Sequence, residues 1–330
     1  MLIGQLLEVA KRFGFASRVC FQFLDRAFNH LLGLSEQEES VYAVIPLSVE
    51  PAIGMTNESG TDVVATNLCR ELPAIRPTHY VQSQRVIEYP TLTEVNEASM
   101  LESTSSFRHV KEENTDFEGQ TVALPYVKQL PYDLASACRN RFSPDVDFAL
   151  GKVSQQQLAT LLKGAMDSFS YRNDLDGVQK EQEPRVSLYC CLYNIEGIPD
   201  GAYQYDSPSH ALRLVQRGDY RLQLQYGMSG SNVNMFQVPL CLHVAGNREY
   251  FKTALGYRGY RIQQMEAGML VQRLLLLASA IGMGGHPLLG FDANVCDEIY
   301  KIDPQRKTTL IQIPTGPYRH RPWLRGSLHS

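Results

Sequence analysis

Two groups of arginine residues in this 330-residue chain have the chemistry of a phosphate-binding site. Arg139 and Arg141 stand close to Ser143, and Arg319 and Arg321 follow a predicted strand near the end of the sequence. Arginine offers a phosphate two charged donors at once, and a serine hydroxyl adds another donor. Because arginine pairs of this spacing are also common on solvated surfaces, both interpretations stay open.

A glycine-rich turn behind a long apolar helix is the second candidate. The helix pattern covers residues 257–281, with Leu270, Leu274 and Leu277 on one face and apolar residues on most of the others. It ends at Gly282, where glycine permits backbone conformations that other residues adopt poorly. The backbone amides of residues 286–290 can then face a ligand. The sequence therefore predicts a buried central helix followed by a cofactor-binding turn.

These candidates need a scaffold, and the apolar patterns predict one of mixed type. An amphipathic helix begins after Ser154, which has the chemistry of an N-cap. Runs rich in apolar and β-branched residues predict strands at 121–125, 186–192, 202–206, 238–244 and 308–313. Strands interspersed with long helices indicate an α+β domain.

Composition excludes several classes of protein. A net charge of −4 argues against a general basic surface for nucleic acid. No apolar run is long enough to span a membrane, and the N-terminus lacks the pattern of a signal peptide, so we expect a cytoplasmic protein without a membrane partner. The seven cysteines are scattered and lack paired spacing, so we expect free thiols and no metal site.

The beginning of the chain resembles its end. When Met1 is placed against Met269 without gaps, residues 1–48 match the later segment at many positions, including Gly14 with Gly282 and Pro46 with Pro314. This pattern predicts an internal repeat. Two units of similar apolar periodicity would explain the match without duplication. Matched glycine and proline favour duplication, because they mark backbone geometry rather than hydrophobicity.

The sequence divides into three predicted parts. Residues 1–49 form the partial repeat, the remnant of a tandem duplication. Residues 50–119 are rich in Ser, Thr, Asn, Glu and Pro and read as a connecting region that is partly extended and partly flexible. Residues 120–330 hold the main α+β domain.

Five motifs in the main domain resemble a known family. They are RFSP at 141–144, GIPDGAYQYD at 197–206, RGYR at 258–261 followed by EAG, GMGGHPLLGFD at 282–292, and IPTGP at 313–317. The chain is similar to nitroreductase-like FMN flavoproteins, and within them to the azoline dehydrogenases that mature streptolysin-type and microcin-type peptides. The resemblance implies a nitroreductase-like fold, in which helices flank a central mixed or antiparallel sheet.

The same resemblance implies FMN as cofactor, bound in a homodimer or, here, in a tandem pseudo-dimer. Arg139, Arg141, Ser143, Arg319 and Arg321 would bind the phosphate. Leu289 and Gly290 match the positions whose amides approach flavin N5, while Asn232 and Asn234 are candidates for the ring or ribityl chain. The implied partners are a precursor peptide and a cyclodehydratase or paralogous subunit.

Two positions depart from the family pattern. The Lys-Tyr pair that moves a proton in azoline dehydrogenases is replaced by Ala254 and Leu255, so the catalytic residues are unknown, with Lys252 and Tyr257 as weak candidates. The glycine loop expected at 179–184 is charged instead. We therefore expect an FMN-dependent dehydrogenase or oxidase acting on a ribosomal peptide in bacteriocin-like biosynthesis. A degenerate scaffold subunit and a general NAD(P)H-linked nitro or quinone reductase are the alternatives.

Overall fold

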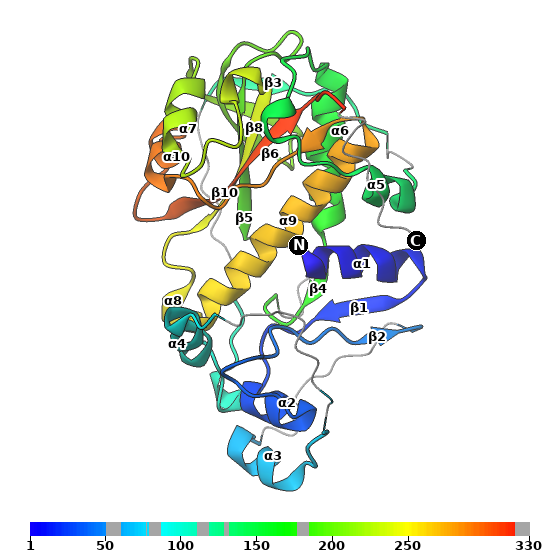
Figure 1. Cartoon of the computed structure of the whole chain (residues 1–330), viewed down its shortest axis with the longest axis vertical. Helices are drawn as coiled ribbons and strands as arrows, with labels where there is room; N and C mark the ends of the chain where they lie inside the picture. The colour runs from blue at the N-terminus through cyan, green and yellow to red at the C-terminus, as the bar shows by residue number, and fades with distance from the viewer. Residues whose placement is uncertain are drawn as a thin grey trace.

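A seven-stranded antiparallel sheet organises the upper part of the molecule in the computed structural model (Figure 1). The structure describes residues 1–50, 61–76, 78, 87–110, 119–128, 132–176 and 185–320. The strand order is β3-β7-β6-β5-β8-β10-β9. These strands are β3 (Thr121–Ala123), β5 (Val186–Leu192), β6 (Gly201–Asp206), β7 (Ala211–Arg217), β8 (Leu240–Asn247), β9 (Gly284–Gly285) and β10 (Lys307–Gly316).

Alternation of side chains along the central strands gives the sheet two buried faces. On β5, Leu188 and Leu192 point to one apolar core, and Tyr189 and Cys191 point to the other. Helices α6 (Gln155–Phe169) and α9 (Arg258–Ala280) cover the first face, while α7 (Arg221–Gly227) and α10 (Ala293–Ile299) lie on the second. The expected α+β fold, with helices flanking a large sheet, is therefore present.

Helix α9 is the central element, as its apolar pattern predicts. It runs across the middle of the molecule (Figure 1), and nearly all of its residues from Arg261 to Ala278 are buried. Its end is set by Gly282, which has a φ of +78° that residues with a Cβ adopt poorly. Helix α6 packs beside α9 and begins at the predicted cap, where the Ser154 hydroxyl accepts a hydrogen bond from the Gln157 amide at 3.1 Å.

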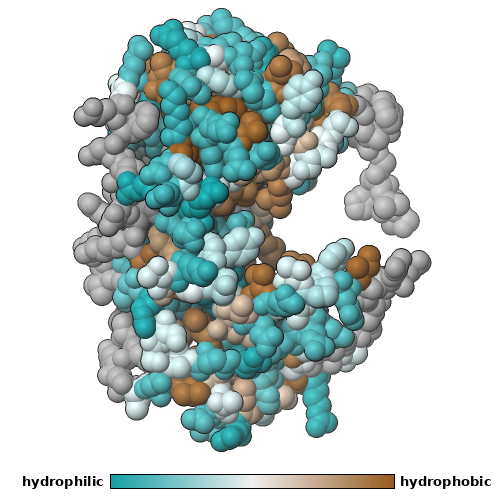
Figure 2. Space-filling model, turned by 90° about the vertical axis from the view of Figure 1, so that its left-hand side faces the viewer, coloured by the Kyte–Doolittle hydropathy of each residue, from teal (hydrophilic) through white to brown (hydrophobic). Residues whose placement is uncertain are grey.

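The N-terminal residues form a small unit against α9. Helix α1 (Leu2–Arg12) packs on α9, and strand β1 (Ala16–Val19) lies between β2 (Leu47–Ser48) and β4 (Arg172–Asn173) in a three-stranded sheet. Helix α2 (Asp25–Leu32) lies below that sheet (Figure 1). In the space-filling view, a notch at mid-height separates the outline of this lower part from that of the large sheet, and apolar side chains are visible at its inner end (Figure 2).

The predicted connecting region contains regular structure where it is described. Helices α3 (Ala65–Glu71) and α4 (Pro90–Ala98) and the short 3₁₀ helix η1 (Thr104–Ser106) fall within residues 50–119. The Asp62 carboxylate also accepts a hydrogen bond from the Ser105 amide at 3.0 Å. The segment around residues 98–106, expected to be flexible, is therefore tied down by side-chain hydrogen bonds. The remaining elements are α5 (Leu134–Asn140), α8 (Lys252–Leu255), η2 (Asp145–Asp147) and η3 (Met235–Gln237).

Candidate functional site

The arginine-serine loop lies against the glycine pair that follows α9. The Gly285 amide donates to the Phe142 carbonyl at 3.3 Å, and the Ser143 hydroxyl donates to the Gly285 carbonyl at 3.4 Å. A Cβ at Gly284 would collide with the Pro144 ring, so only glycine allows this close approach. The RFSP and GMGGHP motifs, more than a hundred residues apart in sequence, therefore meet at the edge strand β9.

The end of β10 joins the same place. The rings of Phe142 and Tyr318 stack with centroids 4.9 Å apart, and the Arg319 amide donates to the Asp147 carbonyl at 2.9 Å. The side chains of Arg141 and Arg319 are exposed, and neither guanidinium has a hydrogen-bond partner among the described residues. The guanidinium groups of Arg141 and Arg319, unpaired within the described residues, thus belong to segments that pack together. This arrangement is suited to binding an anion.

Arg139 is placed differently. It lies in the last turn of α5, where its Nε atom donates to the Ala135 carbonyl of the same helix at 3.3 Å. Arg321, the remaining predicted phosphate ligand, lies outside the described residues, as do the charged residues 179–184.

The predicted cofactor turn connects β9 with α10. Leu288 pairs with Gln312 of β10 through two backbone hydrogen bonds of 2.7 and 3.1 Å, and the Gly290 carbonyl accepts from the Ser229 amide at 2.8 Å. Leu289 between these anchors is 75% exposed. In the described part of the chain, the amides of Leu289 and Gly290 have no acceptor. The turn is therefore held firmly while two of its donors remain available.

His286 links this turn to two neighbouring segments. Its Nε2 atom lies 3.1 Å from Asn232 Nδ2, and its Nδ1 atom lies 2.9 Å from Asp145 Oδ1, outside hydrogen-bond alignment. Burial lowers the pKa of His286, and the Asp145 carboxylate offsets part of that shift. The Asn234 side chain is already used, because its oxygen accepts from the Phe236 amide at 3.1 Å and caps η3. Of the two asparagines, only Asn232 contacts the turn.

The two catalytic candidates lie together at the other end of α9. Lys252 Nζ is 5.0 Å from the centre of the Tyr257 ring, and both side chains are exposed. Tyr257 precedes the first turn of α9, whereas the cofactor turn follows its last turn, about 35 Å away along a helix of 23 residues. Figure 1 shows α8 at that far end. Within this chain, the pair is not brought to the candidate site.

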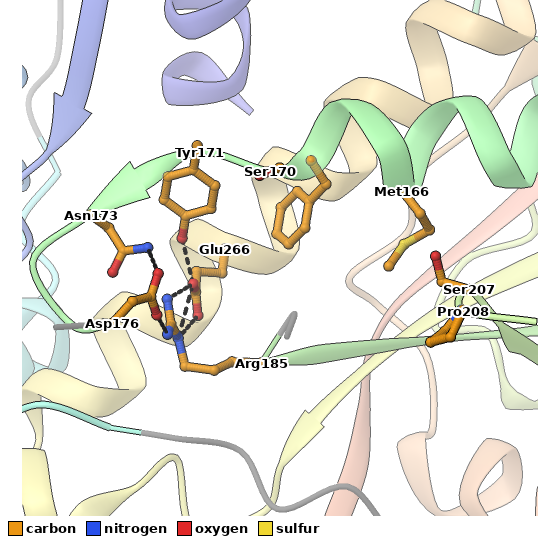
Figure 3. Close-up of a pocket in the computed structure, with 10 residues that line it drawn as sticks. Met166, Ser170, Tyr171, Asn173, Asp176, Arg185, Ser207, Pro208 and Glu266 are labelled. Carbon is orange, nitrogen blue, oxygen red and sulfur yellow. Dashed lines mark hydrogen bonds and ion pairs between the residues drawn. The ribbon is translucent and has the colours of Figure 1, made fainter. Parts of the chain in front are cut away.

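A separate cavity of about 240 Å³ lies between α6, α9 and the start of β5. Its polar wall is a buried cluster in which Arg185 binds both oxygens of Glu266, at 3.1 and 3.0 Å from Nε, and also pairs with Asp176 (Figure 3). Burial and the Glu266 charge raise the pKa of Tyr171, whose hydroxyl donates to Glu266. The charged groups of this wall are therefore already paired with one another.

This cluster corrects one expectation for Glu266. From the sequence, Arg258 or Arg261 in the same helix is the expected ion-pair partner of Glu266, but the structure gives that role to Arg185 of the strand segment. Arg258 and Arg261 instead bind Asp25 of the N-terminal unit, at 2.6 and 3.0 Å. The physical reason is helix geometry, since only residues three or four apart are neighbours on a helix. Arg258 lies about 12 Å from Glu266 along the helix axis, and Arg261 is turned about 140° around it.

Two contributors to the site were missed by sequence reasoning. Tyr318 stacks on the RFSP loop, and Asp145 faces His286 from a left-handed backbone conformation with φ of +50°. Both are neighbours of motif residues, so extending RFSP and IPTGP by one residue each would have included them. Among the described residues there is no cluster of His, Cys, Asp and Glu that could hold a metal ion, and no described helix is long and apolar enough to cross a membrane.

The fold and this convergence at β9 place the protein among the nitroreductase-like α+β folds. A crystal structure of a nitroreductase-like protein from Anabaena variabilis superimposes with a TM-score of 0.68 at 17% identity, covering 96% of this chain and 64% of the other. Residues 179–316 match the family model described as "Nitroreductase family". The chain therefore has a nitroreductase-like fold, and residues 179–316 are similar to the nitroreductase family.

Two further comparisons cover a smaller share of this chain. "Putative nitroreductase MJ1384" of Methanocaldococcus jannaschii is 26% identical over 132 residues, which are 40% of this chain and 64% of the relative. A chain of the E. coli microcin synthetase McbBCD complex, solved with truncated pro-MccB17 bound, has a TM-score of only 0.44 at 22% identity, covering 63% of this chain and 80% of the other. This chain spans slightly less than two thirds of the length of both the Anabaena and the Methanocaldococcus proteins.

Proposed function

We propose that this protein binds FMN and is an oxidoreductase that acts on a ribosomally made peptide, oxidising an azoline to an azole or a related Cα–Cβ bond. The observation that carries the FMN assignment is the convergence of three segments at β9: the loop with Arg141, the turn with the Leu289 and Gly290 amides, and Arg319 after β10. Within the described ranges, none of these guanidinium and amide groups has a hydrogen-bond acceptor. Together they offer separate donors for a phosphate and for a planar ring.

The residues present fit FMN. Arg141 and Arg319 would bind its phosphate, since they are exposed cations on segments that pack together at β9. Ser143 would join them if its hydroxyl turned from the Gly285 carbonyl to the phosphate. The Leu289 and Gly290 amides would face flavin N5, and Asn232 would lie beside the ring. Bound FMN supplies the hydride chemistry, so the role of the chain is to bind and orient it. Arg139 would contribute less than Arg141, because its Nε already donates to its own helix and only its Nη groups remain for a phosphate.

The proposal of a peptide substrate rests on the motifs that this chain shares with azoline dehydrogenases. Ala254 and Leu255 stand where that branch has its proton-moving pair, and Leu255 is buried. Lys252 and Tyr257 are nearby groups that could move a proton, with the phenols of Tyr250 and Tyr260 beside them. Lys252 and Tyr257 lie far from the turn at Leu289–Gly290 of the same chain. They would move a proton at a flavin site only if that site were formed with a second chain, or if the bound peptide reached from one place to the other.

A degenerate scaffold subunit is the second candidate, and the missing proton-moving pair is the observation that favours it. Such a protein would bind FMN and assemble with a cyclodehydratase or an active paralogue. A general NAD(P)H-linked nitro or quinone reductase is the third candidate, since it needs the flavin site but no peptide-specific base.

Arg141→Ala tests the cofactor assignment. We expect at least a tenfold rise in the Kd for FMN, because a free guanidinium bound to a phosphate contributes more than about 1.4 kcal/mol. Arg139→Ala is the matched control, and its Kd should change less than threefold. The Kd is measured by titrating the purified protein with FMN and following flavin fluorescence. Equal effects of the two substitutions would contradict the assignment to Arg141.

The three activities are separated by their products. Incubation of the FMN-loaded protein with a thiazoline-containing peptide should remove two hydrogens, detected as a mass change of the peptide. Turnover that begins only after adding a partner subunit would identify the scaffold. Consumption of NADPH with a simple quinone, and no change of peptide mass, would identify the general reductase instead.

A further inference from the structure

The strand pairing within residues 1–48 repeats the strand pairing within residues 269–316. In the first unit Ala16 pairs with Ser48 and Ser17 with Leu47; adding 268 to each number gives the pairs of β9 and β10, Gly284 with Gly316 and Gly285 with Thr315. The same offset converts the bridge Cys20–Val44 into the bridge Leu288–Gln312. The two segments thus have one pairing register.

Helix ends and side-chain contacts follow the same offset. Helix α1 ends at Arg12 and α9 ends at the corresponding Ala280, and each is followed by a glycine with positive φ, +77° at Gly14 and +78° at Gly282. The Asn29 side chain accepts from the Val41 amide at 3.0 Å, and the corresponding Asp297 accepts from the Thr309 amide at 2.8 Å. Two segments that share only an apolar pattern need not agree in helix ends, glycine conformation and side-chain hydrogen bonds. The agreement therefore favours a repeat over chance similarity.

Helices α1 and α9 also meet at corresponding positions. A Cβ at Gly4 would lie 3.1 Å from the Cβ of Gln272, its own counterpart at the offset of 268, and 3.2 Å from the Cα of Met269. Two identical elements related by a two-fold axis make this kind of contact, in which a residue on the axis touches its own copy. Figure 1 shows α1 starting beside the middle of α9 and running across below its upper half.

The counterpart of the cofactor turn is occupied by a carboxylate. Residues Phe21 and Gln22 correspond to Leu289 and Gly290, and their amides donate to the two oxygens of Asp174 at 2.9 and 2.8 Å. Asp174 reaches them because it directly follows β4, which pairs in parallel with β1. At the later unit, β9 is the edge strand of its sheet, and no described residue accepts from the equivalent amides.

We propose that residues 1–48 are a partial structural repeat of residues 269–316. In this repeat, the Asp174 carboxylate accepts the two hydrogen bonds that a ligand accepts from the Leu289 and Gly290 amides. The chain then has one ligand-binding turn and one turn that is occupied by its own carboxylate. The ligand at Leu289 and Gly290 is a planar group with adjacent acceptor atoms. This identity of the ligand rests on the proposed function, whereas the role of Asp174 is independent of it.

Removal of the carboxylate tests the role of Asp174. Asp174→Ala leaves two amides without acceptors, so we expect the Tm to fall by about 5 °C in sodium chloride. Because Asp174 is partly exposed, sodium formate of equal ionic strength should return a small carboxylate to the amides and restore at least half of the loss. Leu175→Ala is the matched control, since it removes a buried side chain but no acceptor.

Formate that is no better than chloride for Asp174→Ala, or equally effective for Leu175→Ala, would overturn the assignment. If Asp174→Ala does not fold in chloride, its soluble yield during refolding is compared in the two salts, and recovery in formate alone is the expected result. A second readout uses ¹⁵N-labelled wild-type protein. Added FMN should shift the amide signals of Leu289 and Gly290 and leave those of Phe21 and Gln22 unchanged.

The outcomes separate this inference from the proposed function. Rescue by formate without any FMN-induced shift would support the carboxylate-filled repeat and reject the flavin site. Shifts at Leu289 and Gly290 without rescue by formate would support the flavin site and reject the role of Asp174. Shifts at Phe21 and Gln22 on adding FMN would contradict a self-occupied turn.

Discussion

Asp25 pairs with two buried guanidinium groups through a single carboxylate. Arg258 lies 2.6 Å from one of its oxygens and is only 1% exposed, and Arg261 lies 3.0 Å from the other. Burial, followed by the nearby Arg258 charge, lowers the pKa of Arg261 to about 10. The Phe21 carbonyl accepts two further hydrogen bonds from Arg258. The arginines of the RGYR motif thus bind the N-terminal unit to α9.

Asp25→Asn should destabilise the protein strongly, since it leaves two buried cations without their carboxylate. We expect a loss of about 3 to 5 kcal/mol in the free energy of unfolding. Asp167→Asn is the control, because Asp167 pairs with Lys163 on the exposed side of α6 and should cost less than about 0.5 kcal/mol. Urea denaturation measures both. A loss below 1 kcal/mol for Asp25→Asn would show that the pair is not coupled to folding.

His243 should make stability depend on pH. It is fully buried between Tyr300 and Gln312, and burial lowers its pKa from 6.5 to about 4. The folded state therefore keeps the ring neutral where the unfolded chain is protonated, so the stabilisation is complete above pH 6.5 and is lost as the pH falls toward 4. We expect about 2 kcal/mol of loss between pH 7.5 and 5.

The contribution of His243 is isolated by substitution. In His243→Gln, the same pH interval should change the free energy of unfolding by about 2 kcal/mol less than in the wild type, whatever the absolute stability of the variant. Urea denaturation at the two pH values gives both slopes. Identical slopes would mean that other groups cause the pH dependence.

At the scale of elements, apolar periodicity predicted the parts that bury the most surface. Strand β5 has the predicted bounds, β6, β8 and β10 differ by a few residues at their ends, and α9 ends just before the predicted glycine. These elements are continuous in sequence, and each has one clear period. Helices α3 and α4 were missed, because their polar sequences carry no such period. Helix α3 is held by α2, and α4 is linked to α2 by the ion pair of Glu97 with Arg26.

The sequence predicted which motifs belong to the candidate site, but it did not predict which side chains contact one another. The loop at Arg141–Ser143 and the turn at Leu289–Gly290 do lie on segments that meet, as the family resemblance implies. The partner of Glu266, the stacking of Tyr318 and the hydrogen bonds of Asp174 depend on which segments the fold brings together. A single sequence does not contain that information in local patterns.

At the scale of the whole molecule, the N-terminal unit and the main domain form one packed body. The Glu8 carboxylate meets Arg273 of α9 at 2.8 Å in a buried ion pair, and α1 contacts α9 through Gly4. Asp25 joins the unit to the first turn of α9, and Asp174 joins it to the segment that follows β4. If residues 1–48 replace part of a second copy, one chain holds one complete flavin site.

Titration of the purified wild-type protein with FMN tests this account most directly. The bound flavin is counted from the visible absorbance of the protein after free FMN is removed by gel filtration. The account predicts a yellow protein that retains one FMN per chain, since the second turn is filled by Asp174. A colourless protein, or one that retains two FMN per chain, would contradict it.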